Sequence, residues 1–197
     1  IQLTVKAPSG NYYYPAVISK KGASLGAGGW EIFSAGSSWE LRANNMSPGW
    51  IVLGAINDNM WKVLTLVFDG ENSQIKVYEN GVLKNTGTMN MNTLAMDNFP
   101  FRIGQISGYS VVEHKVLFKE LRIFNKALNV AEITENGCLP KITSTHSMYN
   151  SLIGYWRMNE TSGTVVKSEI NPAHNFTIIG SNYTWSSFTD LPLSLCN

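Results

Sequence analysis

The stretch from Trp61 to Leu83 constrains the fold more than any other part of the chain, and it reads WKVLTLVFDGENSQIKVYENGVL. β-Branched and aromatic residues dominate its first run, which ends at Asp69-Gly70, a pair typical of turns. From Gln74 to Glu79 apolar and polar residues alternate with the period of two that marks a half-buried strand. Asn80-Gly81 then supplies the two positive-φ positions of a type I′ hairpin turn. The stretch therefore predicts an antiparallel meander.

The same stretch resembles the LamG-like, concanavalin A-like jelly rolls, in which a W-x-x-apolar-x-apolar-x-apolar-D-G strand leads to apolar-x-apolar-Y-x-N-G-x-L. Two further stretches resemble motifs of that family, FRIGQ at residues 101–105 and FKELRIFNKAL at residues 118–128. The resemblance implies an all-β fold, an antiparallel concanavalin A-like β-sandwich of the jelly-roll type. It implies less about chemistry, because this fold hosts enzymes, lectins and adhesion modules. Relatives often carry Asp where this chain has Lys119, so a charge-dependent role of that Asp does not carry over.

Length and charge exclude several classes of protein. The 197 residues suffice for one sizeable sandwich, or for a sandwich with a small appendage. The net charge is +1 and only 15% of the residues are charged, so the basic footprint of a nucleic-acid-binding protein is missing. No window approaches the roughly 20 apolar residues of a membrane span. The chain opens directly on IQLTVK without a signal-peptide pattern, so we expect a fragment or a processed form.

Short strand patterns occur on the N-terminal side of the meander, at residues 1–6, 16–20, 30–35, 38–43 and 50–55. No helix pattern follows the glycine-rich segment 22–29. We therefore interpret this segment as a flexible connection and not as a phosphate-binding loop.

Two features lie on the C-terminal side of the meander. The long irregular stretch 84–100 is interpreted as a functional or partner-facing loop. Asn129 followed by Glu132 has the pattern of a capping box, which predicts a short helix that runs through Ile133 and ends at Gly137. LamG-like domains close in the same way.

The tail of the chain resembles the opening of a LamG-like domain. LIGYW at residues 152–156 and NETSG at residues 159–163 resemble its first strand. Residues 176–180 and Trp185 resemble the segment that follows that strand. Similar tails follow LamG-like domains in bacterial surface proteins, which implies a bacterial protein that is extracellular, on the cell surface or periplasmic.

These repeats of family elements suggest a division of the chain. We predict a sandwich over residues 1–137 and a small appended β unit over residues 138–197 that packs beside it. In the alternative, the tail docks into the first sandwich as its missing edge strands. Either arrangement covers the open edge of the sandwich. Such cover is expected because an exposed sheet edge carries unpaired N–H and C=O groups that can pair with another chain.

Cys138 and Cys196 are the only cysteines. An even pair in a chain of extracellular composition predicts a disulfide that ties the last residues back to the end of the sandwich. Two unrelated buried thiols are the alternative.

Catalytic signatures are missing. Retaining glycosidases of this fold class carry a Glu-x-Asp-x-x-Glu strand, which places two carboxylates on one face. No such motif occurs here, and Glu31 and Glu40 lie on separate predicted strands. The sequence also lacks a G-x-S-x-G elbow and metal-ligand histidine spacing. We do not expect an enzyme, and a glycoside hydrolase with a non-standard carboxylate pair is left as an alternative.

Glycan binding is the function that we favour. Sugars stack their apolar faces on exposed aromatic rings, and their hydroxyls bond to amide, carboxylate and guanidinium groups. The chain is rich in aromatic residues, and the Tyr12-Tyr13-Tyr14 run must place rings on both faces of a strand. The resemblance assigns Trp61 and Trp156 to the core. The candidate ligand contacts are Tyr12, Tyr14, Trp39, Arg42 and Asn44.

No cofactor is required, but some jelly rolls hold a structural Ca²⁺ with carboxylate and backbone oxygens. Asp58, Asp69 and Asp97 lie in predicted turns and are candidate ligands, with ordinary turn residues as the alternative. The sequence thus predicts a lectin-like, non-catalytic module of a larger polysaccharide-handling polypeptide, with a glycan and other domains of that polypeptide as partners. The alternative is a protein-interaction or structural adhesion module.

Overall fold

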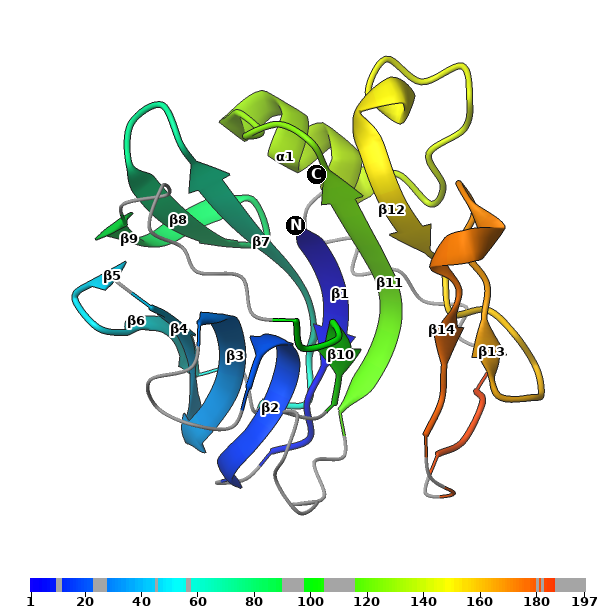
Figure 1. Cartoon of the computed structure of the whole chain (residues 1–197), viewed down its shortest axis with the longest axis horizontal. Coiled ribbons are helices and arrows are strands. Elements are labelled where there is room, and N and C mark those ends of the chain that lie inside the picture. Colours follow the sequence, from blue (N-terminus) through cyan, green and yellow to red (C-terminus); the bar gives the residue numbers. More distant parts are fainter. Residues whose placement is uncertain are drawn as a thin grey trace.

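The computed structural model describes residues 1–9, 12–22, 28–44, 46–55, 58–89, 98–104, 116–179, 181 and 183–186, with the backbone alone for residues 12–15. Two antiparallel sheets pack face to face, and a two-stranded sheet stands beside them (Figure 1). The fold is an all-β sandwich, as predicted.

The larger sheet has seven strands in the order β12-β11-β1-β7-β8-β9-β5. Their bounds are β1 Gln2–Lys6, β5 Met46–Ser47, β7 Trp61–Asp69, β8 Gln74–Glu79, β9 Val82–Met89, β11 Leu117–Phe124 and β12 Leu152–Trp156. The predicted meander is confirmed as β7, β8 and β9, which pair antiparallel in succession. Asn80 and Gly81 have φ values of 49° and 76°, the left-handed values that their hairpin turn requires.

The smaller sheet has five strands in the order β10-β2-β3-β4-β6. Their bounds are β2 Tyr12–Lys21, β3 Gly29–Gly36, β4 Ser38–Ala43, β6 Ile51–Ala55 and β10 Arg102–Ile103. The remaining elements are α1 Val130–Cys138, the hairpin of β13 Val165–Val166 and β14 Phe176–Thr177, and 3₁₀ turns at Tyr149–Ser151 and Pro172–His174.

The main core fills the space between the two sheets. Each strand sends alternate side chains inward, so Leu64 and Leu66 of β7 meet Ile32 of β3 and Leu41 of β4 in one cluster. Trp39 is completely buried in this cluster.

A second core covers the other face of the seven-stranded sheet, which we call its outer face. Helix α1 and the chain that follows it lie against this face (Figure 1). Val67 and Phe124 from the sheet pack there with Ile133 of α1 and with Ile142 and Met148 beyond the helix.

The capping box of α1 is confirmed, because Asn129 Oδ1 accepts from Glu132 N–H and the Glu132 carboxylate accepts from Asn129 N–H. The predicted end at Gly137 is wrong, because the helix continues to Cys138. Pro140 follows the C-cap residue Leu139, and proline cannot continue a helix. The stop signal was therefore this proline and not the glycine.

The tail of the chain both extends the sandwich and adds to it. Strand β12 pairs antiparallel with β11 and forms the edge of the seven-stranded sheet. The expected division at residue 137 places this strand in the appended unit, whereas the pairing of β12 matches the alternative in which the tail supplies a missing edge strand. Among the described strands, β13 and β14 are the ones that lie outside the two main sheets.

Aromatic rings join this hairpin to the sandwich. Phe176 of β14 stacks on Trp156 of β12 with 4.3 Å between ring centroids, and on Phe101 with 5.8 Å. Phe101 in turn meets Trp30 of the five-stranded sheet edge-on at 6.0 Å. The hairpin is therefore docked against both sheets.

Candidate functional site

The structure separates the five predicted glycan contacts. Trp39 is completely buried between the sheets, so its assignment as a ligand platform is corrected, because inward positions of β4 face the core. Tyr12 and Tyr14 lie in β2, but their side chains fall outside the described residues. Tyr12 pairs with Gly36, whereas Asn44 bonds to Gly29 at the other end of β3. These ends are about 23 Å apart at the rise of a strand, so the five residues do not form one compact site.

Arg42 and Asn44 have structural contacts. The Arg42 guanidinium lies 4.0 Å from the centroid of the Phe33 ring and 3.5 Å from the Glu40 carboxylate. Asn44 Oδ1 accepts from Gly29 N–H at 2.8 Å, and Asn44 N–H donates to Gly29 O at 3.1 Å. Beside them, Glu31 forms a buried ion pair with Lys21 at 3.6 Å, and burial raises the pKa of the Glu31 carboxyl.

The described calcium candidates are engaged by protein donors. Asp58 Oδ2 pairs with Lys62 Nζ at 2.6 Å. Asp69 accepts from the side-chain and backbone N–H groups of Asn72 and pairs with Lys76, and the hydrogen bonds from Asn72 chiefly lower the pKa of Asp69. Asp97 lies outside the described residues, and the described ones hold no group of three His, Cys, Asp or Glu side chains that could bind a metal.

Cys138 is the last residue of α1. Cys196 lies outside the described residues. The disulfide between them therefore stays a prediction.

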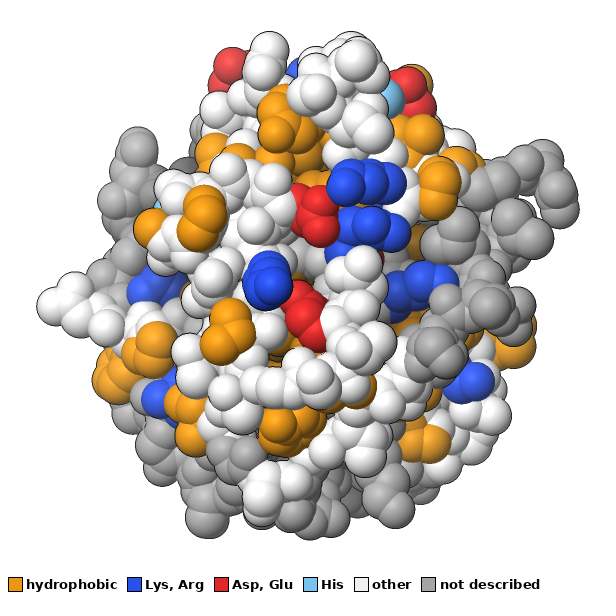
Figure 2. All heavy atoms as spheres, turned by 90° about the vertical axis from the view of Figure 1, so that its right-hand side faces the viewer, with side chains coloured by type: hydrophobic (Ala, Val, Ile, Leu, Met, Phe, Trp, Pro, Cys, Tyr) orange, Lys and Arg blue, Asp and Glu red, His pale blue; other side chains and the backbone are white. Residues whose placement is uncertain are grey.

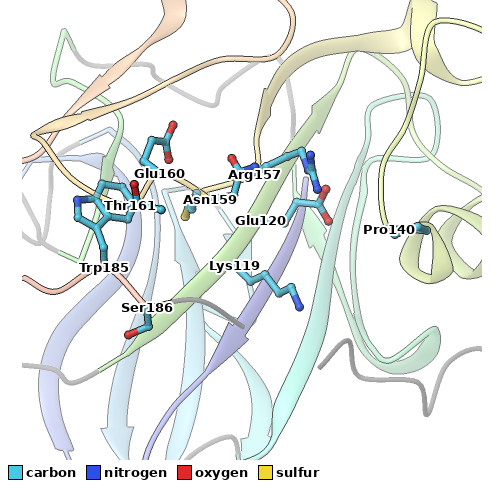
Figure 3. A pocket seen from close by; sticks show the side chains of 10 residues that line it. Lys119, Glu120, Pro140, Arg157, Asn159, Glu160, Thr161, Trp185 and Ser186 are labelled. Carbon is cyan, nitrogen blue, oxygen red and sulfur yellow. The ribbon is translucent and has the colours of Figure 1, made fainter. Parts of the chain in front are cut away.

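A cavity with several polar lining residues lies between the sandwich and the tail, and we call it the tail pocket. Its volume is about 470 Å³. Its walls come from β11, from residues 157–161 after β12, and from the tail near Trp185 (Figure 3). The lining residues are Lys119, Glu120, Pro140, Arg157, Met158, Asn159, Glu160, Thr161, Trp185 and Ser186.

Local backbone irregularities shape two of these walls. Thr4 pairs with Glu120 and Val5 with Phe118, so Lys119 is the extra residue of a β-bulge. Bulges re-aim side chains and are common beside functional sites. Met158 has a φ of 48°, which is uncommon for a residue other than glycine, asparagine or aspartate. This residue turns the chain out of β12 and into the pocket wall.

Two carboxylates that are distant in sequence line the tail pocket. Glu120 Oε2 pairs with Arg122 at 2.8 Å, and Glu160 Oε1 accepts from Lys167 N–H at 2.7 Å. Glu120 Oε1 and Glu160 Oε2 are buried, and among the described residues neither oxygen has a hydrogen-bond partner. A buried acceptor without a donor costs roughly 1–3 kcal/mol of stability. A ligand that donates a hydrogen bond to such an oxygen would remove this cost.

Trp185 supplies an aromatic wall. Its Nε1–H donates to Gly163 O at 2.9 Å, and Tyr183 Oη donates to the same carbonyl at 3.2 Å. The two rings meet at 84°. The indole is thus held at its nitrogen edge while it lines the pocket (Figure 3).

A second cavity of about 420 Å³ lies where the hairpin meets the sandwich, and it is lined mainly by the aromatic residues that dock the hairpin. Its rim carries Lys20, His174 and Asn175. With so few polar groups in its lining, it suits a sugar less well than the tail pocket does.

Charges of both signs are mixed on the face that bears the tail. Figure 2 shows basic and acidic side chains next to one another near the middle of this face, with apolar side chains scattered around them. On this face the described residues form no basic stripe of the kind that binds nucleic acids. None of the described helices has the length and apolar character needed to cross a membrane.

The sequence does not predict the tail pocket, although several of its lining residues belong to the family-like motifs. Glu120 belongs to the FKELRIFNKAL stretch, and Glu160 and Trp185 belong to the tail stretches. In the sequence, these stretches indicate the fold of two separate units. The pairing of β12 with β11 brings the stretches together, and no spacing in the sequence indicates that contact.

Residues 1–134 match the family model of the concanavalin A-like lectin/glucanases superfamily. Among solved structures, the chain is similar to a Bacteroides ovatus protein described as carbohydrate-binding, with 13% identity and a TM-score of 0.65 over 87% of this chain and 49% of that one. It is also similar to the binding domain of Paraclostridial Mosquitocidal Protein 1, with 14% identity and a TM-score of 0.54 over 93% and 56% of the two chains. The chain spans about half the length of these two structures. No curated protein sequence matches it.

Proposed function

Because the chain belongs to the concanavalin A-like lectin/glucanases superfamily, we propose that it is a non-catalytic carbohydrate-binding module and that the tail pocket is its ligand site. The proposal rests on one observation: a cavity of about 470 Å³ combines an indole wall with two carboxylates that each keep an unpartnered buried oxygen. An aromatic surface and a few convergent polar groups are what a polyhydroxylated ligand needs.

Each part of the pocket has a role in this proposal. Trp185 offers its ring to the apolar face of a sugar ring. Glu120 and Glu160 accept hydrogen bonds from hydroxyl groups, since ionised carboxylates act as acceptors only. Arg157 and Asn159 line the same cavity and donate to sugar oxygens.

A glycosidase reading of the two carboxylates is less well supported. The Glu-x-Asp-x-x-Glu strand of retaining glycosidases is missing from the sequence. Glu120 Oε2 is also already engaged by Arg122 at 2.8 Å. We therefore assign both carboxylates to binding.

We place the module outside the cell, because lectin-like domains are often extracellular. The chain covers about half of the two similar structures, so we also propose that it works beside other domains of a longer polypeptide.

A glycan-array screen with the wild type and Trp185→Ala tests this function. We expect selective glycan binding that falls at least about tenfold, or 1.4 kcal/mol, in Trp185→Ala. Trp50→Ala is the matched control, because Trp50 is 53% exposed and is not a residue of the tail pocket, and it should bind like the wild type. Near-UV circular dichroism of each variant checks that the fold is intact.

Binding that survives Trp185→Ala would keep the function and reject the tail pocket as its site. A blank array would reject glycan binding, and a protein-interaction module would then be the better hypothesis.

A further inference from the structure

The geometry of the tail pocket points to a specific ligand class: we propose that the site prefers glycans that carry free amino groups, with the ammonium held between Glu160 and Trp185. This inference rests on the proposed function, because it names the ligand of the same pocket.

The tail pocket has two chemically different ends. Figure 3 shows Arg157 beside Glu120 on one side, and Glu160 beside Thr161 and Trp185 on the other. At the first end, Glu120 is already compensated by its ion pair with Arg122 at 2.8 Å. The carboxylate at the first end therefore has a cationic partner within the protein.

At the second end, the Glu160 carboxylate is fixed but not neutralised. Its Oε1 accepts from the backbone N–H of Lys167 at 2.7 Å, a neutral donor that orients the group without cancelling its charge. Its Oε2 is buried and has no hydrogen-bond partner among the described residues. A charged donor satisfies such an oxygen better than a hydroxyl does, because charge-assisted hydrogen bonds are roughly twice as strong as neutral ones.

The indole next to this carboxylate favours a cation as well. The face of a tryptophan ring carries negative potential, so it attracts an ammonium group. Trp185 is held by its bond to Gly163 O at 2.9 Å and by its edge-on contact with Tyr183. A positioned indole beside a fixed carboxylate is thus suited to an ammonium, which both groups attract. A neutral hydroxyl is bound by the hydrogen bond to the carboxylate alone.

The other cations of the pocket do not occupy this end. Lys119 Nζ lies 5.9 Å from the centroid of the Trp61 ring, and Figure 3 shows its side chain directed away from Glu160. Arg157 stands beside Glu120 in the same view. An amino sugar can therefore place its ammonium at Glu160 and its hydroxyls at the end with Arg157 and Glu120.

Three hexasaccharides with the same linkage test the preference, one each of glucosamine, N-acetylglucosamine and glucose, which differ only in the group at the second carbon. Isothermal titration calorimetry is run at mildly acidic pH, where the amine is charged, and at physiological ionic strength, which screens non-specific attraction. We expect the glucosamine hexamer to bind about tenfold more tightly than the other two, a difference of 1.4 kcal/mol.

The substitution Glu160→Gln should abolish this difference, because it removes the negative charge that pairs with the ammonium while keeping an amide oxygen as an acceptor. Glu71→Gln is the matched control, because Glu71 is an exposed residue of the β7–β8 turn and the variant loses the same charge outside the pocket. It should keep the full preference.

Four results would overturn the inference. Equal or tighter binding of either uncharged hexamer would refute the amino preference while leaving glycan binding standing. An equal loss in Glu71→Gln would show a general effect of charge. A lysine octapeptide that binds as tightly and responds to the same substitution would show that the site recognises a basic peptide and not a glycan. Absence of binding to all three hexamers would refute the inference, and the array would then decide about glycan binding separately.

Discussion

Arg122 of β11 contacts both β1 and the end of α1. It is 2% exposed on the outer face of the seven-stranded sheet. Its guanidinium donates to Asn136 O and Leu139 O at the end of α1, to Gln2 Oε1 on β1 at 3.5 Å, and to Glu120 at 2.8 Å. The positive charge also lies at the C-terminus of the helix, where the helix dipole favours a cation. The arginine of the FKELRIFNKAL motif therefore holds α1 on the sheet.

The substitution Arg122→Met should lower the free energy of unfolding by about 3–5 kcal/mol, because it leaves buried acceptors without donors and Glu120 without its counter-ion. Urea denaturation followed by tryptophan fluorescence measures the change. Arg157→Met makes the same chemical change at a partly exposed arginine, and we expect it to alter stability by no more than about 0.5 kcal/mol. Similar losses in both variants would contradict this role of Arg122.

At the scale of elements, the hairpin β13–β14 has too few backbone bonds to be stable by itself. Only two residue pairs join its strands, and an isolated two-stranded hairpin is marginal in water. Its position depends on Phe176, which stacks on Trp156 and Phe101. The Trp156 indole also donates from Nε1 to His174 O at 2.8 Å. Aromatic docking thus positions the segment that leads to Trp185 and the tail pocket.

The substitution Phe176→Ala should release the hairpin at a cost of about 1–3 kcal/mol, less than truncation of a fully buried phenylalanine. Hydrogen exchange measured by mass spectrometry should show faster exchange over residues 163–179 and unchanged exchange in β7 and β8. The control is Ile179→Ala, a truncation in the same segment of a side chain that is 80% exposed. Unchanged exchange in Phe176→Ala would show that the ring does not dock the hairpin.

At the scale of the whole molecule, the second core is shared between the family region and the tail. Ile142, Met148, Leu152 and Tyr155 come from beyond residue 137, and they pack with Val67 and Phe124 of the main sheet. Burial of the Tyr155 hydroxyl raises its pKa to about 12, because β12 is enclosed at this position. The sandwich is therefore incomplete without part of the tail.

A chain that ends at residue 137 should fail to fold cooperatively. It lacks four large buried side chains, worth about 6–12 kcal/mol in all, which approaches the total stability of a typical domain. A chain that ends at residue 158 keeps β12 and the second core, so it should unfold cooperatively in a thermal melt while losing glycan binding. Cooperative unfolding of the shorter chain would support the boundary at residue 137.

Local patterns predicted much of this architecture and little of the site. The β7–β8–β9 meander and the capping box at Asn129 depend on residues that are close in sequence, and both are confirmed. Trp39 failed as a ligand contact because the face of a strand that turns inward depends on the partner sheet. Glu160 and Trp185 were not proposed as a site because their neighbours on β11 lie far away along the chain.

Alternation, turn chemistry and family-like motifs in the sequence by themselves determined an antiparallel sandwich, since these signals act within a few residues. Only the tertiary structure decided where the tail packs and which strand it pairs with. The unpaired edge of β11 needed a partner strand, and β12 provides it. That pairing, and the stacking of Phe176, bring Glu120, Glu160 and Trp185 into one cavity. Such a cavity arises from contacts between distant segments, and no local pattern records them.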